Sequence, residues 1–136
     1  MNPLTLEWID KAEGDMITAQ REYRARTRPN YDAVCFHAQQ TAEKYLKAFL
    51  QESGKDIPHI HNLVELVSLC LEIDGTFSIL EPELRGLDGY AVRTRYPGQN
   101  ANKEEAIKAL NISKGVRRFI RKKFLVKINP PSLLTG

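Results

Sequence analysis

Apolar and small residues recur along most of this chain at the spacing of an α-helix. The clearest case is the segment 34–50, where they fall at positions 34/35, 38, 42, 45/46 and 49, a period of about 3.6 residues. Ala38 and Ala42 lie at the centre of this stripe, and their small side chains allow another helix to approach closely. No segment shows the alternation that indicates a β-strand. The pattern therefore predicts an all-helical protein.

Breaks in the pattern divide the chain into five predicted helices. Asn30 is a suitable N-cap for the second helix, and Gly54 is a suitable residue to end it. Asn102 with Glu105 three residues later forms a variant capping box for the last helix, while Pro97 ends the fourth. We expect helices at about residues 5–26, 31–53, 62–73, 82–95 and 102–126.

Helices of this length, joined by short loops, favour an antiparallel arrangement. We therefore expect an all-α fold, an up-and-down four-helix bundle with a short extra helix. One domain covers residues 1–128, and residues 129–136, which include Pro130 and Pro131, form a flexible C-terminal tail. A chain of 136 residues is long enough to bury about two-thirds of its unfolded surface.

The composition is that of an ordinary globular protein, with 42% apolar and 27% charged residues. No apolar run approaches the roughly 20 residues that a transmembrane helix needs. The first residues lack the basic and apolar regions of a signal peptide. Cys35 and Cys70 are isolated within apolar helical patterns, so we expect buried free thiols and a cytoplasmic protein.

The net charge of +3 is unevenly distributed, because seven cations and no acid lie between Lys114 and Lys127. Runs of this kind bind phosphates in nucleic-acid-binding proteins. The alternative is a solvated helix face whose cations suit the C-terminal end of the helix dipole. We favour the solvated face, because the same segment must also supply core side chains. These are Val116, Phe119, Ile120 and Phe124.

The other face of the second predicted helix carries polar side chains that can donate or accept hydrogen bonds. Four of them lie within about 80° of one another on a helical wheel, namely His37, Gln40, Lys44 and Lys47. They could contact the phosphate of a nucleotide or RNA. The alternative, which we favour, is a solvated or dimer-facing surface. On that surface Glu43 and Lys47 would form an i,i+4 pair worth a few tenths of a kcal/mol.

The best candidate site is the Arg-Thr-Arg-Tyr-Pro-Gly sequence at the end of the fourth predicted helix. Arg93 and Arg95 could hold a phosphate with forked donors while Tyr96 stacks on a base. In the alternative, the two arginines pair with acids such as Asp88 or Glu83, and Tyr96 packs in the core. The sequence alone favours neither interpretation over the other.

His61 lies just before the third predicted helix, where it either caps that helix, bonds a neighbouring loop or assists the candidate site. His59 and His61 flank Ile60, but without a nearby cysteine or matched acids this pair is a weak metal signal. The sequence contains no P-loop, no GxGxxG motif and no nucleophile elbow. We expect no metal and no cofactor.

Four landmarks of the sequence resemble the HEPN domain family and occur in the order of that family. They are the Trp-x-x-Lys-Ala-x-x-Asp run at 8–15, the helix at 36–50, His-Asn-Leu at 61–63 and Arg-Tyr-Pro at 95–97. The resemblance covers about residues 8–120. It implies a helical bundle that forms homodimers. In small prokaryotic members it also implies pairing with a minimal nucleotidyltransferase in a toxin–antitoxin system.

Many members of this family are metal-independent ribonucleases with an Arg-x(4–6)-His motif at the fourth helix. Here no histidine follows Arg93 or Arg95. Cleavage by general acid–base catalysis needs a group that titrates near neutrality, and arginine stays protonated. Tyr96 would serve only with a strongly lowered pKa, and His37 or His61 would have to reach the arginines from another helix.

We therefore favour a non-catalytic or weakly catalytic HEPN module that forms a homodimer. It would bind nucleotide, RNA or a nucleotidyltransferase partner through Arg93, Arg95 and Tyr96. Two alternatives stay open. One is an endoribonuclease toxin with a divergent acid–base group, and the other is a purely structural partner subunit. No membrane partner is expected.

Overall fold

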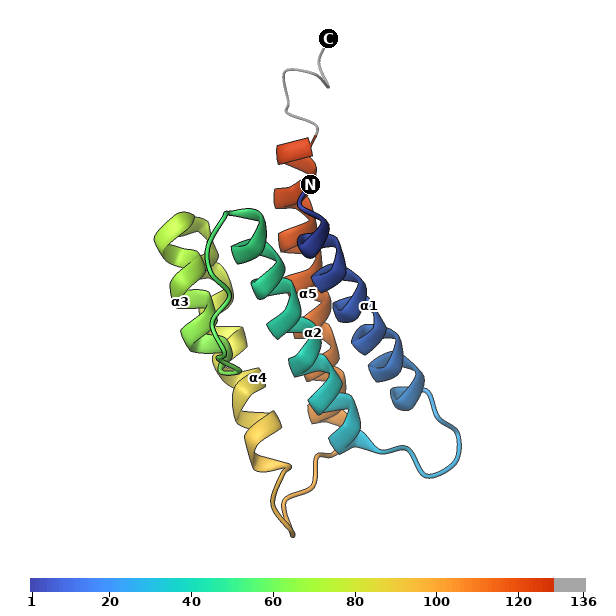
Figure 1. Cartoon of the computed structure of the whole chain (residues 1–136). Coiled ribbons are helices and arrows are strands. Elements are labelled where there is room, and N and C mark those ends of the chain that lie inside the picture. Colours follow the sequence, from blue (N-terminus) through green and yellow to red (C-terminus); the bar gives the residue numbers. More distant parts are fainter. Residues whose placement is uncertain (129–136) are drawn as a thin grey trace.

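Residues 1–128 form a bundle of five α-helices and one short 3₁₀ helix (Figure 1). The computed structural model describes residues 1–128, so the flexible tail expected at 129–136 lies outside the described part. The helices are α1 (Pro3–Tyr23), α2 (Tyr31–Glu52), α3 (Leu63–Ile73), η1 (Gly75–Leu80), α4 (Glu81–Arg93) and α5 (Lys103–Ile128). Residues 1–128 contain no β-strand, which confirms the all-α fold. No helix among these residues has both the length and the apolar character needed to span a membrane.

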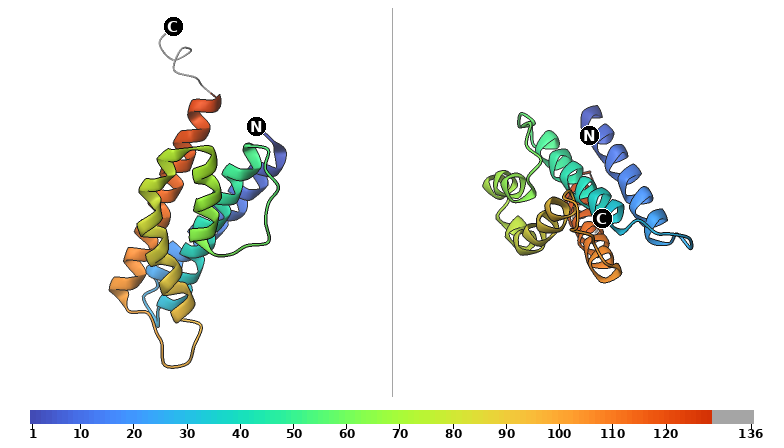
Figure 2. Two further views of the ribbon diagram at one scale, coloured as in Figure 1. Left: turned by 90° about the vertical axis from the view of Figure 1, so that its left-hand side faces the viewer. Right: turned by 90° about the horizontal axis from the view of Figure 1, so that it is seen from below.

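Four helices alternate in direction along the bundle, and the fifth is the short extra helix (Figures 1 and 2). The alternating helices are α1, α2, α4 and α5. The segment 53–62 runs back along the bundle after α2, so that α3 runs parallel to α2. This return places the residues just before α3 beside the middle of α2.

The first helix begins earlier and ends earlier than its apolar pattern predicts. Asn2 Oδ1 accepts a hydrogen bond from the Leu4 N–H at 2.8 Å, and Pro3 occupies the first turn, where its missing N–H costs nothing. The helix ends at Tyr23 rather than at Arg26. The residues after Tyr23 therefore belong to the turn between α1 and α2.

Two capping predictions are confirmed in atomic detail. Asn30 Oδ1 accepts from the Ala33 N–H at 3.0 Å at the start of α2. Asn102 and Glu105 form a reciprocal capping box, with backbone-to-side-chain bonds of 2.8 and 3.1 Å. Gly54 follows α2 with a φ of 78°, in the left-handed region that glycine adopts without strain.

Helix α2 lies at the centre of the bundle and packs against α1, α3, α4 and α5. Ala38 and Ala42 are fully buried, as is Ala12 of α1, so the predicted small stripe is at a close helix contact. Tyr45 and Phe77 are the largest fully buried side chains. The face of α2 expected to be apolar is therefore the main core element.

Both cysteines are buried and free, as the sequence predicts. Burial raises the pKa of the Cys35 thiol to about 11 and that of the Cys70 thiol to about 12. Thiolates are the reactive form of cysteine, so these two side chains act as small apolar core residues.

The N-terminus lies beside the C-terminal part of α5. Met1 and Leu6 share a hollow of about 300 Å³ with Phe124 and Leu125. The turn between α1 and α2 and the loop between α4 and α5 lie at the opposite end of the bundle (Figure 1). The candidate residues that follow α4 are therefore remote from the N-terminus.

Candidate functional site

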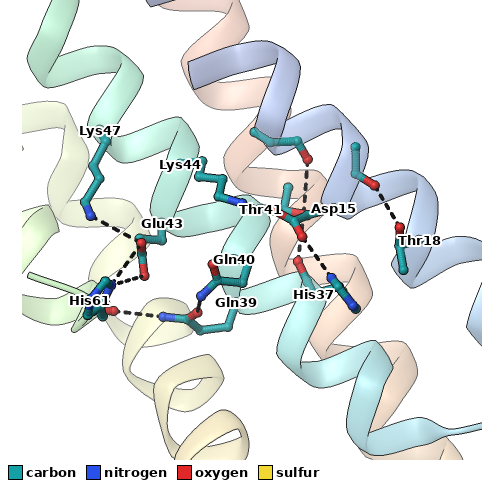
Figure 3. A network of polar contacts seen from close by, with 12 residues as sticks. Asp15, Thr18, His37, Gln39, Gln40, Thr41, Glu43, Lys44, Lys47 and His61 are labelled. Carbon is teal, nitrogen blue, oxygen red and sulfur yellow. Dashed lines mark hydrogen bonds and ion pairs between the residues drawn. The ribbon is translucent and has the colours of Figure 1, made fainter. Parts of the chain in front are cut away.

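The polar residues of α2 form two groups, one towards α3 and one towards α1 (Figure 3). In the first group, Glu43 Oε2 lies 3.2 Å from Lys47 Nζ, and each side chain is only 5% exposed. The Lys47 ammonium also lies 5.6 Å from the centre of the Trp8 ring. The expected i,i+4 pair therefore forms, but the expected solvated surface is wrong for both residues. The reason is that α1 and the segment before α3 cover this part of α2.

His61 contacts the same carboxylate from the segment that precedes α3. Its Nδ1 lies 3.2 and 3.3 Å from the two carboxylate oxygens of Glu43, and its side chain remains 74% exposed. Gln39 holds the same segment, since its Nε2 donates to the His61 carbonyl at 2.8 Å. The imidazole is thus fixed to α2 on one side and open to solvent on the other.

The N-terminus of α3 is capped by residues other than His61, so a capping role for this histidine is wrong. Asn62 Oδ1 accepts from the Glu65 N–H at 3.0 Å. Asp88 Oδ2, from α4, accepts from the Leu63 N–H at 2.7 Å. Burial raises the pKa of Asp88, although the hydrogen bonds that its carboxylate accepts from the Leu63 and Val64 N–H groups oppose this shift.

The second group on α2 is organised around Asp15 of α1. His37 Nδ1 lies 2.8 Å from Asp15 Oδ1, and Lys44 forms an ion pair with the other carboxylate oxygen. Gln40 donates to the side chain of Gln39 at 2.9 Å instead. The four polar residues that share one face of the helical wheel therefore have separate partners and do not form one phosphate site.

At the end of α4, Arg93 forms an ion pair with Glu105 of α5. Hydrogen bonding to Arg93 lowers the pKa of Glu105, and the same bond raises the pKa of Arg93. Arg93 thus pairs with an acid, as the alternative interpretation expected, but the acid is Glu105 and not Asp88 or Glu83. Glu105 is available because the α4–α5 loop returns the first turn of α5 to the end of α4. Arg93 is a structural link between two helices.

Arg95 and Tyr96, by contrast, point away from the core. Arg95 lines a cavity of about 200 Å³ together with Gln39, His61 and Asp88. Its guanidinium forms no ion pair within residues 1–128. Tyr96 is 63% exposed, so the alternative in which it packs in the core is wrong. Helix α4 ends at Arg93, two residues earlier than predicted, which places both residues in the α4–α5 loop.

The basic segment of α5 is mainly a core and ion-pair element. Val116, Ile120 and Phe124 are buried, and Arg117 forms a forked pair with the Glu13 carboxylate at 2.7 and 2.9 Å. Hydrogen bonding from Arg117 lowers the pKa of Glu13. Two further cations of this segment have acidic partners: Arg121 with Glu13, and Lys123 with Asp74. The preference for a solvated, structural face is thus supported by the geometry of these residues.

The sequence model of the HEPN domain matches residues 5–123. This chain belongs to the HEPN domain family. Two solved structures share the fold. TT1696 from Thermus thermophilus has a TM-score of 0.75 and 23% identity over 88% of this chain and 97% of that one. ST0689, an archaeal HEPN homologue, has a TM-score of 0.70 and 21% identity over 88% and 96%. No curated protein matches the chain.

In this HEPN domain a histidine and an arginine from separate segments of the chain line the same cavity. His61 and Arg95 line one cavity, whereas His37 is held by Asp15 on the α1 side of α2. The structure thus brings together two of the proposed residues that are 34 positions apart in sequence. Within residues 1–128, no cluster of three or more His, Cys, Asp or Glu side chains is arranged to hold a metal ion.

Two features of this region were missed by the sequence reasoning. Gln39 is buried and fixes the segment that carries His61, and no sequence signal distinguishes it from a surface glutamine. The second feature is a group of arginines at positions 21, 24, 26 and 28, in the last turn of α1 and in the segment that follows it. Four arginines within eight residues are a pattern from which a basic surface could have been predicted.

Proposed function

We propose that this HEPN-domain protein binds the phosphates and bases of RNA or of nucleotides at the α4 end site, defined as Arg95, Tyr96 and His61. The observation that carries the proposal is the position of Arg95. Its guanidinium lines a cavity and has no acidic partner within residues 1–128, whereas Arg93 is occupied by Glu105.

The chemistry of the α4 end site suits this ligand class. An arginine offers forked donors that match a phosphate, and an exposed tyrosine ring provides a stacking surface for a base. The open side of the His61 imidazole supplies a further polar contact. Asp88 also lines the cavity, but its carboxylate is engaged by the backbone of α3. This engagement limits its repulsion of a phosphate.

The test is binding of a fluorescein-labelled dodecanucleotide RNA without secondary structure, followed by fluorescence anisotropy. The double variant Arg95→Ala/Tyr96→Ala should weaken binding at least tenfold, since loss of about 1.4 kcal/mol changes affinity by that factor. Arg118→Ala, which removes an exposed guanidinium from α5, is the matched control and should leave the affinity unchanged. Equal affinities for wild type and the double variant would refute the proposal.

A second candidate, an endoribonuclease, is favoured by the contact between His61 and Glu43. A carboxylate at 3.2 Å orients the imidazole, and Arg95 lies at the same cavity to stabilise a negatively charged phosphorane. In this mechanism the imidazole would accept the proton of the 2′-hydroxyl as its oxygen attacks phosphorus and the P–O5′ bond breaks. The leaving 5′-oxygen would take a proton from water, and the products would be a 2′,3′-cyclic phosphate and a 5′-hydroxyl. Cleavage of structured RNA in EDTA that disappears in both His61→Ala and Arg95→Ala would establish it. Intact RNA with retained binding would exclude it.

We also propose that the protein forms a homodimer, as HEPN domains commonly do, and that its partner is a minimal nucleotidyltransferase. Exposed apolar side chains, including Val92 at the cavity and Phe36 of α2, are suited to such an interface. Light scattering should give about twice the chain mass of 15.5 kDa. A neighbouring reading frame for a nucleotidyltransferase would support the two-component system, and co-purification of the two products would test it.

A further inference from the structure

The turn between α1 and α2 presents a dense group of exposed guanidinium groups. We call this group the arginine turn, and it consists of Arg21 in the last turn of α1 together with Arg24, Arg26 and Arg28 after the helix; all four side chains are exposed. Within residues 1–128 none of these four side chains forms an ion pair. The basic segment of α5 differs in this respect, because three of its cations are bound to Glu13 or Asp74.

The acids nearest in sequence hold the shape of the arginine turn. Glu22 Oε1 accepts a hydrogen bond from the Asn30 N–H at 2.7 Å. Asp32 Oδ1 accepts from the Ala101 N–H at 2.6 Å, which ties the start of α2 to the α4–α5 loop. Both carboxylates thus accept backbone N–H groups and leave the guanidinium groups free for another anion.

The arginine turn and the α4 end site lie at the same end of the bundle (Figures 1 and 2). A hollow of about 380 Å³ lies beside the arginine turn and is lined by residues 28–32 and by Asn100 and Ala101 of the α4–α5 loop. Arg28 lines this hollow directly, and Arg95 and Tyr96 begin the loop that supplies Asn100 and Ala101. The α4–α5 loop therefore connects the α4 end site with the hollow that Arg28 lines.

The backbone fixes the direction of this turn. Arg28 has a φ of 48°, in the left-handed region that side chains with a Cβ rarely adopt, and Pro29 follows it. A strained residue of this kind persists where the surroundings determine its conformation. The bonds from Glu22 and Asp32 provide such surroundings.

We infer that the arginine turn is a second phosphate-binding surface, which holds the continuation of an RNA strand bound at the α4 end site. The inference rests on the proposed function and makes it more specific. The ligand is a single-stranded RNA of several nucleotides, since simultaneous contact with two separate groups of side chains requires more than one phosphate. Guanidinium groups suit this role because they remain charged and bind phosphate oxygens with two donors.

The test compares two labelled, uridine-rich RNAs, a trinucleotide and a dodecanucleotide, by fluorescence anisotropy at salt concentrations from about 50 to 200 mM. The variants are Arg26→Ala/Arg28→Ala for the arginine turn and Arg95→Ala/Tyr96→Ala for the α4 end site. Arg118→Ala/Lys122→Ala is the control, because it removes the same charge from exposed positions of α5. Circular dichroism melting shows that each variant is folded.

We expect Arg26→Ala/Arg28→Ala to bind the trinucleotide as the wild type does and the dodecanucleotide about tenfold more weakly. The slope of log affinity against log salt is negative, and its magnitude should decrease by about 1.4. The two lost arginines would remove two phosphate contacts, and each contact on a single strand contributes about 0.7. The α5 control should change neither value.

Failure of this inference and failure of the proposed function give different results. If Arg95→Ala/Tyr96→Ala abolishes binding while Arg26→Ala/Arg28→Ala binds the dodecanucleotide normally, the arginine turn is not a contact and the proposed function stands. If Arg95→Ala/Tyr96→Ala binds both RNAs normally, or if the wild type binds neither, the proposed function and this extension both fail. A loss in the α5 control alone would place the RNA on α5 and overturn the inference.

Discussion

Glu43 and Lys47 form an ion pair one helical turn apart whose side chains are each only 5% exposed. Removing two charges from water is costly, and their attraction offsets that cost only while both partners are present. The Glu43 carboxylate also contacts His61, which lines the candidate cavity. A pair that supports the core of the bundle therefore also orients a residue of the α4 end site.

The buried pair predicts a large difference between single and double substitutions. Glu43→Ala leaves the Lys47 ammonium buried without its acid and should lower the free energy of unfolding by about 3–5 kcal/mol. Glu43→Leu/Lys47→Leu should recover most of this loss, because no uncompensated charge remains. Urea denaturation measures both values. Glu72→Ala, which removes an exposed acid of α3, is the control, and a Glu43→Ala loss as small as that control would contradict the prediction.

The Asp74–Lys123 pair predicts a specific response of stability to acid. Hydrogen bonds from Lys123 and Thr76 lower the pKa of Asp74 to about 2, from its ordinary value of 3.8. A carboxylate with a lowered pKa in the folded state contributes stability that is complete above its unfolded pKa and is lost as the pH falls. The free energy of unfolding should therefore decrease between about pH 4 and pH 2, and less steeply in Asp74→Asn. Denaturant titrations at several pH values measure this slope; Glu72→Gln serves as control, and equal slopes for wild type and Asp74→Asn would exclude the effect.

The small residues of α2 predict intolerance of larger side chains in the core of the bundle. Ala42 is fully buried there, so Ala42→Leu should overpack the core and cost about 1–3 kcal/mol. Lys11→Leu on the exposed face of α1 should change stability by less than about 0.5 kcal/mol. Thermal and urea unfolding measure both variants. A neutral Ala42→Leu would mean that the helices packed around α2 can move apart without loss of packing.

The left-handed conformation of Arg28 predicts that glycine is tolerated at this position. Glycine adopts a φ of 48° without strain, although its freedom in the unfolded chain offsets part of the gain. Arg28→Gly should therefore be more stable than Arg28→Ala by up to about 1 kcal/mol. Both variants should lose RNA affinity equally, because both lose the guanidinium. If Arg28→Gly melted below Arg28→Ala, the turn would not be strained.

Local sequence rules predict most of the fold. The side-chain caps at Asn30 and Asn102, the stop at Gly54 and the small stripe at Ala38 and Ala42 depend on residues close together in sequence, and all are confirmed. The predicted helix ends were less accurate. Helix α4 ends at Arg93, whereas the prediction placed its end at Arg95. The final turn of a helix depends on contacts that periodicity does not record.

The candidate site was less predictable because its partners come from distant segments. Glu43 and Lys47 have the spacing of a surface pair, and only the return of the segment 53–62 past α2 shows that they are covered. Glu105 pairs with Arg93 across a loop, while Arg95 and Tyr96, two and three residues later, face solvent. Sequence alone indicates which residues have suitable chemistry; the topology decides which of them meet.

The position of the N-terminus beside the last turns of α5 has a practical consequence. Met1 and Leu125 line one hollow, at the end of the bundle remote from the arginine turn. A sensor surface or fluorescent fusion attached at Met1 would face away from the loops proposed to hold RNA. Immobilising the protein in this orientation leaves the binding end directed into solution, where long transcripts can approach it without obstruction.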